Sequence, residues 1–321
     1  MRAHLLLAAA LGALAGASAA CAQAAGAPER APLSTFAYDR SAPLELRTGP
    51  AETVQGMQIS PVSFASPRGG RATGLVVVPP GRGRFAGIVL QHGMPGSAAV
   101  TVPQALYLAR HGAVVVALDA PFARRGGRYN LMTEADSAEQ VQLIVDLQRA
   151  VDLLLARRDV DPARLAYVGR SYGGAMGALL AGVERRLKTF VLMVGDGGLV
   201  AHVTGPEDED FMGRLLRPQR ERWLAAMRPI EPSLFVGLAP PASILFQNGR
   251  RDDLVPVRDA EALHAAARSP KTVRWYDAGH SLNAQAYVDQ LDWLHRAIGT
   301  TPPGPGDQEG PTPVRRQGNG V

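Results

Sequence analysis

Short runs of apolar residues recur along the chain and alternate with polar turns. Most of the runs are rich in Val, Ile, Leu and Ala, and are followed at once or within a few residues by Gly, Pro or Asp. Continuous apolar runs of this length indicate strands buried on both faces, as in a parallel sheet covered by helices. The predicted strands span residues 74–78, 86–90, 113–118, 165–168, 190–194, 243–246 and 272–276, and residues 54–64 could add a leading strand.

Between these runs, apolar residues recur every three to four positions, which predicts amphipathic helices. The clearest helix spans residues 137–157, with Asp161-Pro162 just beyond its end. Alternating strands and helices predict one α/β domain over residues 54–298, with a mostly parallel, doubly wound sheet and helices on both faces. Ligands bind such folds outside the carboxyl ends of the strands. The other predicted helices span residues 103–110, 173–183, 257–267 and 284–298.

Three segments depart from this alternation. Residues 25–53 form an N-terminal extension before the domain. Residues 299–321 are rich in Gly, Pro and polar residues and lack apolar periodicity, which predicts a disordered tail. Residues 196–240 hold an acidic run and an Arg-rich stretch, and we expect a short helical excursion there, either a lid near the site or a surface insertion.

Residues 1–24 have the pattern of a signal peptide. Arg2 gives a positive start, residues 5–15 are apolar but too few to span a bilayer unless extended, and small residues follow. We therefore expect export, to the periplasm or out of the cell, and no transmembrane segment. Residues 18–21 read Ser-Ala-Ala-Cys and resemble a lipoprotein box, although the first position normally holds a larger aliphatic residue. A lipid anchor at Cys21 is the alternative.

Charge and cysteine content exclude several functions. The 321-residue chain has a formal net charge of +5 and a pI of about 9.7, but its arginines are scattered and form no run that would follow a phosphate backbone. We therefore expect no nucleic-acid partner. Cys21 is the single cysteine and lies in the leader, so the domain has no disulfide, no cysteine zinc site and no thiol nucleophile.

Residues 169–173 read Gly-Arg-Ser-Tyr-Gly and fit the pattern Gly-x-Ser-x-Gly. The pattern is short, but here it leaves a predicted strand and opens a predicted helix, which is the context of a nucleophile elbow. Small flanking residues are needed because the sharp turn strains the serine backbone and leaves no room for side chains. Ser171 is therefore the candidate nucleophile, and a glycine-rich turn with an incidental serine is the alternative.

A serine hydroxyl needs a base to take its proton, and in this type of fold the acid and the histidine follow the serine along the chain. Residues 247–256 and 277–280 each follow a predicted strand, so both loops lie at the edge of the sheet where Ser171 is expected. His280, at the end of the second loop, is the candidate general base. Three further histidines lie in or at the ends of predicted helices and are expected on the surface: His111, His264 and His295.

Residues 249–256 read Gly-Arg-Arg-Asp-Asp-Leu-Val-Pro. They resemble the Gly-x-x-Asp-x-x-Val-Pro acid loop of α/β-hydrolases, notably dienelactone-hydrolase-like esterases and prolyl-oligopeptidase-type peptidases. In that pattern Asp252 is the acid. Asp253 is an adjacent rival, and Asp196 a more distant one because some relatives place the acid after the preceding strand. Residues 276–280, Tyr-Asp-Ala-Gly-His, resemble the histidine loop of the same superfamily.

The same resemblance, which covers about residues 74–298, implies an oxyanion hole. A tetrahedral oxyanion needs preorganised N–H donors, one of them from the residue after the nucleophile, here Tyr172. Residues 91–96, Gln-His-Gly-Met-Pro-Gly, resemble the loop that gives the second donor, and imply the backbone N–H of Met94. His92 is expected to shape this loop rather than to catalyse, and an ordinary glycine turn is the alternative.

We therefore expect a serine hydrolase that cleaves small carboxylic esters through an acyl-enzyme, without metal or organic cofactor. A serine peptidase of prolyl-oligopeptidase type is the alternative, although the chain before the domain is too short for the propeller that such relatives usually carry. A non-catalytic hydrolase-like binding protein is a third reading, and it would lack part of the triad. Three arginines after the third strand could bind a substrate carboxylate or form a solvated loop: Arg124, Arg125 and Arg128.

Overall fold

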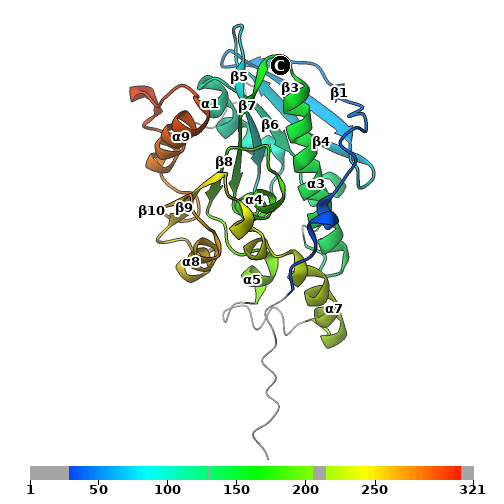
Figure 1. Ribbon diagram of the computed structural model, residues 1–321. Coiled ribbons are helices and arrows are strands. Elements are labelled where there is room, and N and C mark those ends of the chain that lie inside the picture. Colours follow the sequence, from blue (N-terminus) through cyan, green and yellow to red (C-terminus); the bar gives the residue numbers. More distant parts are fainter. Residues whose placement is uncertain (1–28, 127, 129, 205–214, 312–321) are drawn as a thin grey trace, which may run out of the picture.

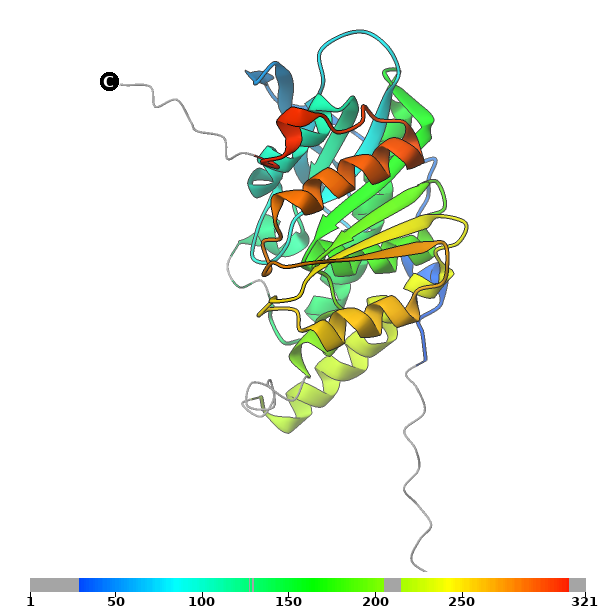
Figure 2. The ribbon, with the colours of Figure 1, turned by 90° about the vertical axis from the view of Figure 1, so that its left-hand side faces the viewer.

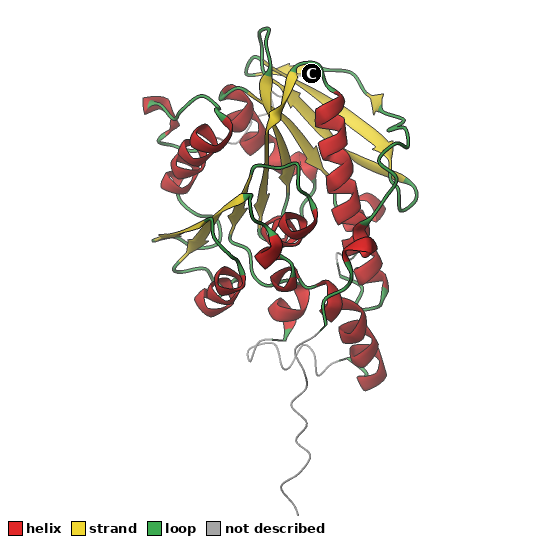
Figure 3. Ribbon diagram, in the orientation of Figure 1, coloured by secondary structure: helices red, strands yellow, loops and turns green. Residues whose placement is uncertain are grey.

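A mixed sheet runs through the centre of the molecule, and helices cover both of its faces (Figure 3). The computed structural model describes residues 29–126, 128, 130–204 and 215–311. Within these residues the sheet has ten strands, in the order β1-β3-β4-β6-β5-β7-β8-β9-β10, with β2 paired to β3. Their bounds are Arg47–Thr48 (β1), Glu52–Val54 (β2), Met57–Ala65 (β3), Arg71–Val78 (β4), Phe85–Gln91 (β5), Ala113–Leu118 (β6), Val160–Arg170 (β7), Thr189–Met193 (β8), Ser243–Gly249 (β9) and Lys271–Tyr276 (β10).

The strands from β6 to β10 are parallel to one another, whereas β4 pairs antiparallel with both β3 and β6. This confirms the predicted α/β fold with a mostly parallel sheet, and all seven predicted strands are present, most of them longer than expected. The expected leading strand at residues 54–64 is β3, preceded by the short β2. A parallel sheet buried on both faces explains why the central strands read as unbroken apolar runs.

Two groups of helices pack on opposite faces of the sheet. Helices α1 and α9 contribute to one apolar cluster, and α3, α4 and α8 contribute to the other (Figure 1). Figure 2 shows α9 lying across the strands on the face turned to the viewer. The α-helices of the described residues are Val102–Arg110 (α1), Pro121–Arg125 (α2), Ala135–Ala156 (α3), Tyr172–Val183 (α4), Leu199–Val203 (α5), Arg217–Met227 (α7), Val257–Ala266 (α8) and Ala284–Ile298 (α9); 3-10 turns are Leu33–Phe36 (η1), Ala98–Thr101 (η2), Arg228–Ile230 (η4), Pro232–Leu234 (η5), Val236–Leu238 (η6) and Pro305–Asp307 (η7).

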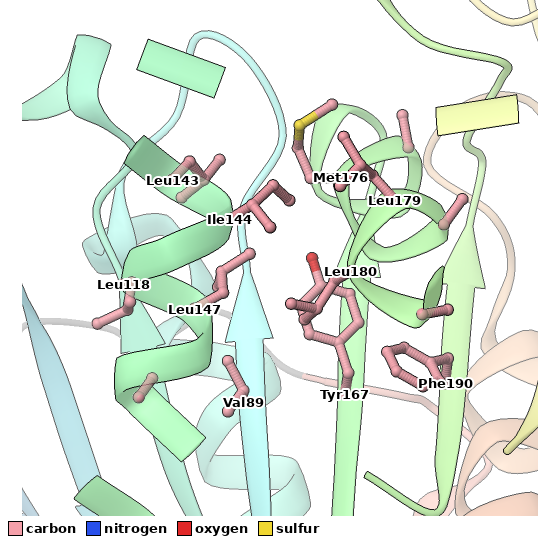
Figure 4. Packing of buried hydrophobic residues seen from close by; sticks show 14 of the residues in the cluster. Val89, Leu118, Leu143, Ile144, Leu147, Tyr167, Met176, Leu179, Leu180 and Phe190 are labelled. Atoms are coloured by element: carbon pink, nitrogen blue, oxygen red, sulfur yellow. The ribbon is translucent and has the colours of Figure 1, made fainter. Parts of the chain in front are cut away.

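The larger core cluster lies between the sheet and helices α3 and α4. Ile144 and Leu147 of α3 and Leu180 of α4 are fully buried, and they meet the side chains of Val89 and Tyr167 from β5 and β7 (Figure 4). Burial of large apolar side chains on this scale is the main favourable term in folding. It fixes α4, and therefore the residue that precedes α4, against the carboxyl end of β7.

The N-terminal extension packs along α3 rather than standing apart. Arg149 donates to the Ala42 carbonyl at 2.9 Å, Gln148 donates to the Phe36 carbonyl at 3.0 Å, and the Phe36 ring is buried. The segment therefore covers one flank of the domain.

The described start of the tail is also packed, so the predicted disorder is wrong for residues 300–311. Asp307 is buried and accepts from His111 Nε2 at 3.1 Å, while the Tyr107 hydroxyl donates to the Asp307 carbonyl at 3.2 Å. Thr301 donates its N–H to the His111 carbonyl at 2.8 Å. The tail needs few apolar residues to pack because its contacts with α1 and the residue that follows α1 are hydrogen bonds. A search for apolar periodicity does not detect contacts of this kind.

Two histidines expected on the surface are buried, whereas His295 is exposed as expected. His111 is held by the tail, and His264 of α8 lies against the rings of Phe246 and Trp275 with its Nε2 3.0 Å from Asn248 Oδ1. Burial, with the Lys271 ammonium nearby, lowers the pKa of His264 to about 4, so this imidazole is neutral. Both imidazoles have hydrogen-bond partners in the core, and buried polar groups are tolerated when they are hydrogen-bonded, which explains the error.

The excursion at residues 196–240 is helical where it is described, as α5, α7 and η4 to η6, and α7 lies beyond the end of α3 (Figure 1). The predicted signal peptide and Cys21 lie outside the described residues, as does the acidic run within the excursion. In the part of the chain that the structure covers, the longest and most apolar helices still fall short of what a bilayer crossing requires.

Candidate active site

The loops that carry the candidate residues meet at one edge of the sheet because neighbouring parallel strands end in register. Arg170, the last residue of β7, lies opposite Met193 of β8, and Met193 lies opposite Gln247 of β9. Gly249 of β9 in turn lies opposite Tyr276 of β10. The carboxyl ends of these strands therefore bring together segments that are far apart in the sequence.

Ser171 stands in a strained turn between β7 and α4. Its φ of 56° and ψ of −122° lie outside the regions that L-residues ordinarily adopt, which costs about 1–3 kcal/mol. The turn is held because the Ser171 N–H donates to the Met193 carbonyl at 2.8 Å and its carbonyl accepts from Ala175 at 3.0 Å. The sharp turn described for nucleophile elbows is thus present at the predicted position.

The two glycines of the motif are required by close backbone approaches. A Cβ on Gly169 would lie 2.2 Å from the Gly173 carbonyl oxygen, and one on Gly173 would lie 2.4 Å from the Gln91 carbonyl oxygen. The buried Tyr167 hydroxyl donates to the Gly173 carbonyl at 2.6 Å and fixes the turn from below. The spacing Gly-x-Ser-x-Gly therefore follows from the packing of β5, β7 and α4.

Asp252 and His280 face each other in a direct pair. His280 Nδ1 lies 2.9 Å from Asp252 Oδ2 and 3.0 Å from Oδ1, and the carboxylate side chain is fully buried. Asp252 also accepts from the N–H groups of Leu254 and Val255, each at 2.9 Å. Burial opposes ionisation of Asp252, but the hydrogen bonds from His280 and these two amides outweigh it and lower the pKa of the carboxyl. Arg170 donates to the His280 carbonyl at 2.9 Å and so holds the histidine loop.

The two rival acids differ from Asp252 in their surroundings. Asp253 is exposed. Asp196 is buried and pairs with a different histidine, because its Oδ2 lies 2.8 Å from His202 Nδ1 and its Oδ1 accepts from the Gly198 N–H at 3.0 Å. This second acid–histidine pair was not predicted, since the pairing depends on how α5 folds back after β8.

Glu231 is a buried residue whose side chain holds the first turn of α5. Its two carboxylate oxygens accept from the N–H groups of Val200 and Ala201, at 3.0 and 3.1 Å. Burial raises the pKa of Glu231 to about 8, although these two hydrogen bonds oppose the shift, and the nearby Asp196 carboxylate adds to it.

The residues expected to form an oxyanion hole lie next to Ser171. Tyr172 is the first residue of α4, so its N–H has no carbonyl partner within the helix. Met94 lies in the loop after β5 and lines the same cavity as Ser171 and Tyr172. His92 shapes this loop, as expected: its Nδ1 lies 2.8 Å from the Gly93 carbonyl oxygen, and its Nε2 accepts from the Ala120 N–H at 3.0 Å.

Ser171 opens into a cavity of about 660 Å³, a volume within the range of small-molecule sites. Apolar side chains make up most of the lining, and a smaller number of polar groups stand among them. Within the described ranges, no three His, Cys, Asp or Glu side chains cluster closely enough to hold a metal ion. Besides Ser171, Tyr172 and Met94, the lining includes Pro95, Arg128, Asn130, Leu131, Met132, Ala175, Val194, Asp196, Gly198, Leu199, His202, Val203, Leu215, Gln219, Leu254 and Val255.

Two of the three candidate substrate-binding arginines do not line this cavity. The Arg124 guanidinium lies 2.8 Å from the buried Asp146 carboxylate, and Arg125 pairs with Glu139. Both are paired within the fold and neither lines the cavity, whereas Arg128 does. The expectation for Arg124 and Arg125 is thereby corrected, because carboxylates on α3 already bind their charges.

The mostly parallel sheet with helices on both faces, and the sharp turn at Ser171 after β7, are those of the α/β-hydrolase fold. Residues 101–301 match the sequence profile of the Prolyl oligopeptidase family. The chain belongs to that family.

Solved structures share the fold at low sequence identity. An acetyl xylan esterase from Paenibacillus sp. R4 has a TM-score of 0.68 and 22% identity, covering 80% of this chain and 90% of its own. Acetyl xylan esterase 1 from Thermoanaerobacterium sp. JW/SL YS485 has a TM-score of 0.65 and 18% identity, over 79% of this chain and 90% of its own. The uncharacterized protein YfhR of Escherichia coli O157:H7 is 24% identical over 157 residues, which are 45% of this chain and 48% of that protein. The match thus spans about half the length of this curated relative.

Proposed function

We propose that this chain is a serine hydrolase that cleaves small carboxylic esters, with Ser171 as nucleophile, His280 as general base and Asp252 as the acid that orients it. The observation that carries the proposal is the direct Asp252–His280 pair at the same sheet edge as the strained Ser171 turn. Ser171 itself opens into a cavity large enough for a small ester. No cofactor is required for this chemistry.

In the first half of the reaction, Ser171 Oγ attacks the ester carbonyl carbon and its proton passes to His280 Nε2. Asp252 holds Nδ1–H of the ring, which fixes the tautomer with a basic Nε2 and stabilises the imidazolium. The C–O bond of the leaving alcohol then breaks, and His280 returns the proton to the alkoxide. Water gives a proton to His280 and attacks the carbonyl carbon of the acyl-enzyme. The tetrahedral intermediate then collapses and releases the acid, and His280 returns the proton to Ser171 Oγ.

The N–H groups of Tyr172 and Met94 stabilise the oxyanion in both halves. The Tyr172 N–H belongs to the first turn of α4, where the helix dipole also favours negative charge. Arg128, which lines the cavity, is proposed to contact a polar or anionic group of the substrate.

Covalent labelling tests the proposal directly. A fluorophosphonate should label the folded wild-type chain, and the Ser171→Ala variant should lose the label. Ser137→Ala, at a serine on α3, serves as the matched control and should keep it. Absence of label on folded wild-type protein would favour a non-catalytic binding protein and overturn the proposal.

Family membership favours one second candidate, a serine peptidase. The same relay would then attack an amide carbonyl, and His280 would protonate an amine leaving group. A panel of 4-nitrophenyl and alkyl esters against aminoacyl and prolyl peptide amides separates the two. Faster turnover of the amides, at matched leaving group, would replace esterase by peptidase.

We also propose export directed by residues 1–24, with a lipid anchor at Cys21 as the alternative. The leader pattern supports this. Mass spectrometry of the chain from fractionated bacterial cells would find a new N-terminus near residue 25, or a lipid-modified Cys21. The intact N-terminus in the cytoplasmic fraction would contradict both.

A further inference from the structure

Asp136 is a buried carboxylate that joins two walls of the cavity. It stands in the first turn of α3, and its side-chain oxygens accept three hydrogen bonds. Leu131 N–H donates to Oδ1 at 2.9 Å, and Met132 N–H and Trp223 Nε1 donate to Oδ2 at 2.8 Å each. Because Asp136 is buried, the loss of any of these donors would leave a carboxylate oxygen without that hydrogen bond, which costs free energy.

Two of these donors belong to a backbone turn that needs support. Met132 has a φ of 54°, in the left-handed region that a long side chain rarely adopts. Besides the bond to Asp136, its N–H lies 3.1 Å from Asn130 Oδ1, and its carbonyl accepts from Gln219 Nε2 of α7 at 3.1 Å. Hydrogen bonds to α3 and α7 therefore hold the turn in this conformation, which Met132 would not favour by its intrinsic backbone preference.

The third donor ties α7 to the same point. Trp223 is fully buried and packs in the cluster that contains Met132. Leu131 and Met132 from the turn and Gln219 from α7 all line the cavity into which Ser171 opens, and Leu199 of α5 extends the apolar wall. Asp136 does not itself line the cavity, but it accepts hydrogen bonds from Leu131 and Met132 of the turn and from Trp223 of α7, and it therefore links these two parts of the wall.

We propose that Asp136 is a positioning residue that sets the substrate preference of the site. By fixing Leu131 and Met132 against α7, it shapes an apolar pocket for an ester that carries a group of several carbons next to the scissile bond, in preference to an acetyl ester of a small alcohol. This inference rests on the proposed ester hydrolysis. The pocket accepts the apolar group on the acyl or on the alcohol side, and the experiment distinguishes the two.

The sharpest variant is Asp136→Asn, which keeps the shape of the side chain but turns one acceptor into an N–H₂ donor. That donor faces N–H groups, so at least one of the three hydrogen bonds is lost and the turn at Leu131 and Met132 is released. The matched control is Asp152→Asn on the same helix. Asp152 also accepts several bonds, among them from the Tyr38 hydroxyl at 2.9 Å, but it does not line or support the cavity.

The readout is kcat/KM over two series of esters: 4-nitrophenyl esters from acetate to octanoate, and acetates of alcohols from methanol to octanol. Wild type should prefer the longer members of one series. Asp136→Asn should lower this preference about tenfold, mainly through KM, while acetate turnover with the small alcohol changes little. Asp152→Asn should keep the wild-type preference. An equal loss on all esters in Asp136→Asn, or an unchanged preference, would overturn the proposal.

Two further measurements keep the test decisive. Trp223→Phe removes one donor while retaining an aromatic side chain, and it should shift the preference in the same direction if Asp136→Asn fails to fold. Binding of 2-decanone, an apolar carbonyl compound that cannot be hydrolysed, is measured in Ser171→Ala with and without Asp136→Asn. Weaker binding in the double variant supports the pocket even if the chain proves inactive on esters, whereas equal binding contradicts it.

Discussion

Gly93 and Ser171 face each other at contact distance across the edge of the sheet. A Cβ on residue 93 would lie 2.9 Å from the Ser171 Cβ and 3.2 Å from the Arg170 carbonyl oxygen. Both neighbours are fixed by the strained turn, so neither can move aside cheaply. Glycine at position 93 is therefore what allows the loop that carries Met94 to lie beside the serine.

We predict that Gly93→Ala lowers kcat/KM for esters about a hundredfold, because a displacement of the loop or of Ser171 by a fraction of an ångström misplaces the reacting groups. The free energy of unfolding should fall by about 1–3 kcal/mol, as for other overpacked sites. Steady-state kinetics and urea unfolding measure the two. Gly306→Ala, where a Cβ would meet nothing within 4 Å, is the control. Wild-type kinetics in Gly93→Ala would show that the contact has no catalytic consequence.

Asp252→Asn should lower kcat by about 10⁴ while the protein stays folded, because the amide no longer stabilises the tautomer and charge that His280 needs. The neighbouring Asp253 is exposed, so Asp253→Asn should keep nearly full activity. Kinetics on one ester at saturating concentration compare the two variants. If the losses were reversed, Asp253 would be the acid and the assignment of Asp252 would be wrong.

Glu231 predicts a specific dependence of stability on pH. Burial raises its pKa to about 8 in the folded chain, against an ordinary value of 4.5. The folded chain therefore keeps a proton that the unfolded chain releases, so the free energy of unfolding should fall as pH rises from about 4.5 to 8, by at most about 1.4 kcal/mol per pH unit. Urea unfolding across this range, in wild type and Glu231→Gln, isolates the contribution. Parallel curves for the two proteins would contradict it.

The packed start of the tail gives a fourth prediction. Asp307→Ala should leave His111 Nε2 buried without its carboxylate, which costs about 1–3 kcal/mol. Asp292→Ala, whose carboxylate is partly exposed on α9, should cost less than 1 kcal/mol. Thermal or urea unfolding measures both. A tail that contributes nothing would leave the two variants equally stable.

Much of the fold could be predicted because its signals are local. The helix expected at residues 284–298 has those bounds in the structure, and the turn around Ser171 lies where the motif placed it. The ends of strands depend on pairing partners that lie far away in the sequence. Strand β7 begins at Val160 because that residue pairs with Phe85 of β5, and no periodicity near Val160 reveals such a partner.

The walls of the site were beyond sequence reasoning for the same physical reason. Asp136 and Trp223 are 87 positions apart and meet only after α7 packs beyond α3. The Asp196–His202 pair depends on the path of the chain after β8, and the burial of His264 depends on rings from two strands. Single residues of this kind carry no pattern, since their roles are set by tertiary partners.

The proposed catalytic residues and much of the cavity lining come from different parts of the fold, which has an evolutionary consequence. Ser171, Asp252 and His280 follow the ends of strands whose positions are set by the central sheet, whereas much of the cavity lining comes from the turn at residues 130–132, α5 and α7. We expect mutations in that part of the lining to change which molecules enter the cavity without disturbing the proposed catalytic residues. A duplicated gene that retains the sheet edge can therefore change its substrate preference, and we expect selection for a new substrate to act first on the turn at residues 130–132 and on helices α5 and α7.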